Sequence, residues 1–128
     1  MNRNQHVSLV VVSLTATLDQ LAPVLGESKL MHHDLGTYRT NGLIRQQTIW
    51  FGEWCAVEGE IEDLLTQVLL WLKARKSALM EIDSQIFLKI ICIPNDGGLA
   101  IDPIIAASVA ELDVLLLVEV GEPPTGEA

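Results

Sequence analysis

The pattern of apolar and polar positions predicts five β-strands along the chain. Val7–Leu14 (VSLVVVSL) is β-branched and apolar at both parities, which is typical of a central strand covered on most of both faces. Thr48–Cys55 (TIWFGEWC) is predicted as a second strand. Ile86–Ile93 and Val114–Val120 are two further apolar runs of strand length, and Leu99–Ile101 is predicted to return as a short partner of Ile86–Ile93.

Apolar residues at helical spacing predict two helices in the first two-thirds of the chain. Thr15–Gly26 is expected to form two turns at most, because Pro23 lies past the first turn. The strongest helix runs from about Glu60 to Arg75, where acidic residues in the first turn and basic residues in the last turn favour the helix dipole. Its apolar stripe consists of Ile61, Leu64, Leu65, Val68 and Leu72.

A third helix is predicted near the end of the chain. Asp102 is the expected N-cap and Pro103 the first helical residue, which is the favoured order of these two residue types. The buried side of this helix is expected to hold Ile104, Ile105, Val109 and Leu112.

The segment between the first helix and the second strand has no periodicity. Glu27–Gln46 is therefore expected to be a long loop or an irregular hairpin around Asn41 and Gly42. Long loops inside small domains are often functional, so this segment is one place to look for a site.

The order of these elements favours an α+β fold. Hairpin and crossover connections are mixed, which predicts a two-layer domain with helices on one face of a largely antiparallel sheet, a ferredoxin-like variant. The length of 128 residues suits a single domain over 1–128. Its ordered core is expected at about 6–120, and the polar residues 121–128 are expected to form a flexible tail.

The net charge of −9 is concentrated in the last third of the chain. Residues 1–76 hold seven basic and eight acidic side chains, whereas residues 77–128 hold Lys89 against nine acids. A surface of this sign repels nucleic acid and anionic lipid and favours basic partners, although solubility alone is the simpler explanation. No apolar run reaches membrane-spanning length, and the start of the chain fits a strand better than a signal peptide. We therefore expect a cytoplasmic protein that binds neither membrane nor nucleic acid.

Candidate chemistry is sparse. His32, His33 and Asp34 are consecutive ligand-type residues, but consecutive residues rarely reach one metal ion and no further ligand motif accompanies them. Cys55 and Cys92 each lie in apolar sequence and are expected to be reduced, buried and structural. We accordingly predict no catalytic residues, no metal site and no cofactor, and hence no enzyme.

The strand Thr48–Cys55 also carries two tryptophans. Ile49, Phe51 and Cys55 share one face of the strand, and Trp50 and Trp54 share the other. The Trp50, Glu53 and Trp54 group would bind a partner if the tryptophans were exposed, whereas a second small core under the loop is the alternative. The predicted partner-binding residues are His32, His33, Asp34, Trp50, Glu53 and Trp54.

The order of features resembles a bacterial family, domain of unknown function 4279. The resemblance rests on the opening VSLVVVSL, the Leu25–Gly26 helix end and a stretch with Gly36, Arg45 and Trp50. It continues through the long amphipathic helix and the C-terminal GGLAIDPIIAASVAELDVLLLVEV. Where this family has a proline soon after the Leu-Gly pair, this chain has Glu27 and Ser28. The resemblance implies an α+β domain with no established activity, and it is compatible with an immunity protein that neutralises a toxin.

We therefore expect a non-enzymatic binding protein, in its most specific form an immunity protein whose protein partner is basic. One alternative is a small-molecule-binding or enzymatic domain that uses the 27–46 loop, and another is a structural domain of a larger assembly. The sequence leaves the oligomeric state open.

Overall fold

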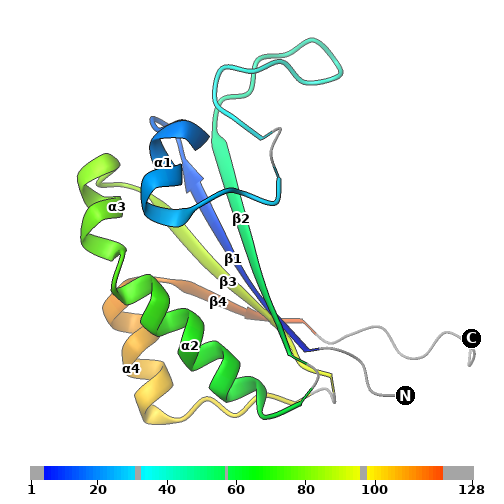
Figure 1. Cartoon of the computed structure of the whole chain (residues 1–128), viewed down its shortest axis with the longest axis vertical. Coiled ribbons are helices and arrows are strands. Elements are labelled where there is room, and N and C mark those ends of the chain that lie inside the picture. The colour runs from blue at the N-terminus through cyan, green and yellow to red at the C-terminus, as the bar shows by residue number, and fades with distance from the viewer. Residues whose placement is uncertain (1–4, 31–32, 57, 96–97, 120–128) are drawn as a thin grey trace, which may run out of the picture.

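A computed structural model describes residues 5–30, 33–56, 58–95 and 98–119. These residues form one four-stranded sheet with helices packed on it, so the predicted two-layer α+β fold is confirmed (Figure 1). The elements are β1 (Gln5–Ser13), α1 (Leu18–Leu25), β2 (Thr48–Ala56), α2 (Ile61–Lys73), α3 (Lys76–Ile82), β3 (Phe87–Ile93), α4 (Pro103–Leu112) and β4 (Leu115–Val118).

The sheet has the strand order β2-β1-β3-β4, with β1 at its centre as its β-branched sequence predicts. β1 pairs antiparallel with β2 and with β3, and β4 lies parallel to β3. The parallel pair is joined through α4, because parallel neighbours need a crossover connection. The sheet is therefore largely antiparallel, with one parallel edge.

The predicted short strand Leu99–Ile101 is wrong, since these residues belong to no strand. The backbone N–H of Ala100 instead donates to the Glu62 carboxylate at 2.7 Å, and Leu99 packs against the core. β3 already has β1 on one side and β4 on the other, so neither edge of β3 is free for a hairpin partner.

β1 begins earlier than the hydrophobic run. Gln5 is 2 % exposed, and its side-chain amide donates to the Gly59 carbonyl at 2.9 Å. This hydrogen bond satisfies a buried polar side chain and fixes the start of the strand. His6 therefore lies within β1, whereas the hydrophobic pattern alone predicted a strand that begins after it. The predicted tail at 121–128 lies outside the described residues.

α1 has the two turns expected, with Pro23 inside it. It starts late because Thr17 and Gln20 form a capping box at its N-terminus. α2 buries the predicted stripe, and Leu69 joins that stripe. α3 follows almost at once and was not predicted. It buries Leu79, and the Lys76 ammonium donates to the Leu112 carbonyl at the end of α4.

α4 has the predicted N-terminus: the Asp102 carboxylate accepts from the Ile105 N–H at 2.8 Å, and Pro103 is the first helical residue. Ile105 and Leu112 are buried as expected. Ile104 is 75 % exposed, so its predicted place in the core is wrong. It lies one position from Ile105, and α4 packs mainly against α2, so only a narrow side of this short helix is buried.

The two faces of the sheet differ. Val7, Leu9 and Val11 point to the face that carries the helices and are fully buried there. The alternate residues point to the opposite face, which the helices leave uncovered (Figure 1). We call this opposite surface the open face. Its apolar members are Val10, Val12, Ile49, Phe51, Phe87, Ile91, Ile93, Leu115 and Leu117.

The long segment before β2 is an irregular hairpin, as predicted. Tyr38 pairs with Ile44, the Arg39 N–H donates to the Leu43 carbonyl, and Gly42 takes the positive φ of 86° that the turn requires. In Figure 1 this hairpin projects beyond the end of the sheet.

Across the described part of the chain, none of the helices combines the length and the apolar character needed to cross a membrane.

Candidate functional site

The structure places the predicted tryptophan group in the core. Trp50 is 3 % exposed and stacks on Trp71 of α2, with ring centroids 6.1 Å apart. Trp54 meets the same ring edge-on at 5.1 Å. Both tryptophans therefore lie on the helix-covered face, where a partner cannot reach Trp50. The prediction that Trp50 contacts a partner is wrong, because the large apolar ring gains more by burial under α2.

Asp34 has a structural role. One carboxylate oxygen accepts from the Leu18 N–H at 2.9 Å and from the Thr48 hydroxyl at 3.2 Å, which ties the loop to α1 and β2. The His33 carbonyl accepts from the Ile49 N–H at 2.9 Å. His32 lies outside the described residues. The structure thus uses Asp34 and the His33 backbone to hold the loop against the start of β2.

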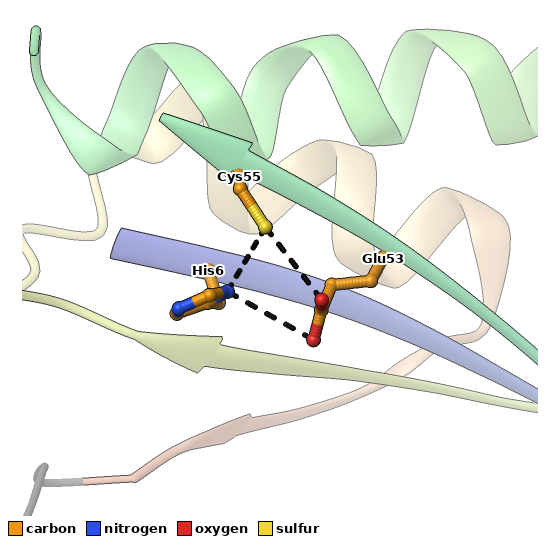
Figure 2. Close-up of side chains that lie close together, drawn as sticks. All are labelled: His6, Glu53 and Cys55. Atoms are coloured by element: carbon orange, nitrogen blue, oxygen red, sulfur yellow. Dashed lines mark hydrogen bonds and ion pairs between the residues drawn. The ribbon is translucent and has the colours of Figure 1, made fainter. Parts of the chain in front are cut away.

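Glu53 lies on the open face, opposite in direction to Trp50 and Trp54, since successive strand residues alternate. It belongs to a different group, which Figure 2 shows: His6, Glu53 and Cys55 point toward one another. The Cys55 Sγ lies 3.0 Å from His6 Nδ1 and 3.6 Å from Glu53 Oε1. His6 Nδ1 lies 3.8 Å from Glu53 Oε2. We call these three residues the His6 cluster.

The strand register creates the His6 cluster. His6 is directly opposite Cys55 in the β1–β2 pair, and Glu53 is two residues before Cys55 on the same face. The Glu-x-Cys spacing on a strand was a visible signal that two of these side chains share a face. The third member required knowledge of the register, which fixes which β1 residue lies opposite Cys55.

The His6 cluster is accessible to solvent. The His6 and Glu53 side chains are 30 % and 28 % exposed, and Cys55 is exposed, so the prediction that Cys55 is buried is wrong. Cys92 is buried as predicted, because it lies on the helix-covered face. The Lys29 ammonium forms an ion pair with Glu53 Oε1 at 3.5 Å. Both cysteines are free thiols.

The arrangement does not match an activated thiol. In a nucleophilic triad, the acid and the nucleophile contact different ring nitrogens of the histidine. Here Cys55 and Glu53 both approach His6 Nδ1. Partial burial, together with the nearby Glu53 carboxylate, raises the pKa of the Cys55 thiol. A raised pKa disfavours the thiolate that nucleophilic chemistry needs.

Comparisons with protein-family models, with curated proteins and with solved structures find no match to this chain. The resemblance to domain of unknown function 4279 stays a prediction.

Proposed function

We propose that this chain is a non-enzymatic binding domain that docks a basic protein partner on the open face of its sheet. The single observation that carries the proposal is the apolar character of that face. Four strands present mostly Val, Ile, Leu and Phe side chains on the side that the helices leave uncovered. Phe87, Leu115 and Leu117 are 46 %, 47 % and 39 % exposed.

The size of the open face supports a binding role. Four strands about 4.8 Å apart and about 23 Å long span roughly 440 Å² of sheet. Apolar patches of roughly 300–600 Å² on soluble proteins are often functional. Each partner of a standard interface contributes about 800 Å². The open face, which also holds the polar residues His6, Ser8, Glu53 and Lys89, would therefore supply about half of the contact, and the surface around it would supply the rest.

The rim favours a basic partner. Asp113 and Glu119 flank β4 and are both exposed. These carboxylates add to a chain of net charge −9, whose field would speed encounter with a positive surface. An apolar centre with a charged rim is the usual anatomy of a specific protein interface. An immunity-type inhibitor of a basic toxin is the most specific form of this proposal.

A face-specific pair of variants tests the proposal. Leu117→Asp places a charge on the open face, and Leu70→Asp makes the same change at a 62 % exposed position on α2. The wild-type chain and both variants are immobilised and exposed to lysate of the source cells. Proteins retained by the wild type and by Leu70→Asp, but lost with Leu117→Asp, are then produced in pure form and titrated calorimetrically at low and high salt.

The proposal expects one basic protein that binds directly, at least about tenfold more weakly to Leu117→Asp and more weakly at high salt. Equal binding by both variants would overturn it. A wild-type dimer in light scattering that Leu117→Asp abolishes would also overturn it, since a second copy would then cover the face. Thermal melting of each variant, with Phe87→Ser as a second open-face change, separates lost binding from lost folding.

A further inference from the structure

We propose that His6, Glu53 and Cys55 form a binding site for a divalent zinc-class cation at the edge of the open face. The inference does not depend on the proposed protein partner. It rests on three different ligand atoms, a nitrogen, an oxygen and a sulfur, which all lie within 4.8 Å of one another. They converge on the space between them, as Figure 2 shows.

The spacing of the ligand atoms fits a tetrahedral ion. Zinc bonds of about 2.3 Å to sulfur and about 2.0–2.2 Å to nitrogen and oxygen place ligand atoms about 3.4–3.6 Å apart. The Cys55 Sγ lies 3.0 Å from His6 Nδ1 and 3.6 Å from Glu53 Oε1, whereas His6 Nδ1 lies 3.8 Å from Glu53 Oε2, the other oxygen of that carboxylate. The three ligand atoms lie within 4.8 Å of one another, so rotation of the Glu53 carboxylate is the main adjustment that would bring one of its oxygens into coordination with Sγ and Nδ1.

The backbone holds the ligands in place. His6 and Cys55 are directly opposite each other in the β1–β2 pair, and Glu53 lies on the same face of β2 as Cys55. Ligands on paired strands lose little conformational freedom when an ion binds, so the ordering cost is small.

The charges and ligand types select the ion. A thiolate and a carboxylate together carry two negative charges, which a divalent cation balances. The Cys55 thiol proton passes to solvent as the sulfur coordinates. Thiolate with imidazole favours zinc over magnesium or calcium, which prefer oxygen ligands. Lys29, 59 % exposed, contacts Glu53 Oε1, which leaves Oε2 for the ion.

The fourth position of a tetrahedral ion would face solvent, because Cys55 is exposed. A site with three protein ligands and one open position takes water or a group from another molecule there. The ligand set of this chain therefore matches an exchangeable site more closely than a closed structural one.

Cobalt(II) and zinc(II) are the probes for the test, used on the tag-free chain. Cobalt(II) should bind in a ratio of one ion per chain and give a thiolate-to-metal charge-transfer band, which zinc(II) then displaces. The wild type and His33→Ala, which changes a loop histidine beside the start of β2, should behave alike. Cys55→Ser should lose the band, and both Cys55→Ser and His6→Gln should weaken zinc(II) binding by more than about 100-fold.

Two results would overturn the site. One is unchanged zinc(II) affinity in Cys55→Ser and His6→Gln, which would place the ion elsewhere. The other is cobalt(II) binding without a charge-transfer band in the wild type, which would exclude Cys55 as a ligand. Circular dichroism of each variant checks that the sheet is retained. A zinc-dependent rise in melting temperature in the wild type, absent from Cys55→Ser, gives an independent readout.

Discussion

Gly52 makes room for a tryptophan, and adding one methyl group there should destabilise the protein. Gly52 lies in β2, two residues after Trp50 and on the same face, so the indole ring lies over it. A Cβ at this position would meet Cη2 of Trp50 at less than contact distance and Cζ3 at 2.7 Å. The ring is held by stacking on Trp71 and by donation from Nε1 to the Gly26 carbonyl at 3.0 Å.

The cost of Gly52→Ala follows from these contacts. Overpacking costs about 1–3 kcal/mol. Displacing the ring also endangers a hydrogen bond that contributes about 0.5–1.5 kcal/mol. Alanine also lowers the conformational entropy of the unfolded chain, which stabilises the folded state by about 0.4–1 kcal/mol. The net loss is centred on about 2.3 kcal/mol, which lowers the melting temperature of a chain this long by roughly 9 °C.

Differential scanning calorimetry measures this loss, and a double-mutant cycle tests its cause. Trp50→Leu removes the ring atoms that a Cβ at position 52 would strike. Adding Gly52→Ala to Trp50→Leu should therefore cost under about 0.5 kcal/mol. A melting temperature within about 2 °C of the wild type, which corresponds to a loss of only about 0.5 kcal/mol for a chain this long, would refute the reasoning. An equal loss in both backgrounds would refute it too.

Three further predictions concern buried groups and a helix cap. Iodoacetamide should label the exposed Cys55 in the native protein and Cys92 only after denaturation, because Cys92 is buried out of reach of the reagent and burial raises the pKa of its thiol to about 11; mass spectrometry of the labelled peptides checks this. The Ser13 hydroxyl donates a hydrogen bond to the Asp83 carboxylate at 2.6 Å, which lowers the pKa of Asp83. The ionised carboxylate therefore stabilises the fold above the pKa of an unfolded aspartate. This stabilisation is lost as the pH falls through the pKa of Asp83 in the folded protein. Asp83→Asn should then be less stable than the wild type in urea at pH 7, and the difference should shrink below about pH 3.9; a constant difference would contradict this origin. Asp102→Ala removes the N-cap of α4 and should lower the free energy of unfolding by about 1 kcal/mol in urea melts followed by circular dichroism, whereas an unchanged midpoint would show that the cap contributes nothing.

The sheet and the main helices could be predicted because they have strong local signals. β1 is rich in valine, and α2 has an apolar stripe with matching charges at both ends. α3 escaped prediction because it is seven residues long, buries Leu79 and has no side-chain cap. Its position depends on contacts with α1 and α4, which come from other parts of the sequence. The residues of α3 themselves therefore carry no pattern that predicts the helix.

The candidate site was missed for a different reason. Alternation along β2 correctly separates Cys55 from Trp50, but it says nothing about which β1 residue pairs with Cys55. That pairing follows from the register, which connects positions far apart in the chain. The hydrophobic pattern also did not predict that β1 begins at Gln5. Gln5 is polar, and its burial is compensated by its hydrogen bond to the Gly59 carbonyl.

The central place of β1 has a consequence for biosynthesis. Its inner neighbour β3 is made much later, since Val12 pairs with Phe87. At roughly 5–20 residues per second, a ribosome needs roughly 4–15 s to travel from one strand to the other. During that interval the most β-prone segment of the nascent chain has no partner on its β3 side. Productive folding in the cell therefore depends on keeping this first strand from aggregating until the second half of the chain emerges.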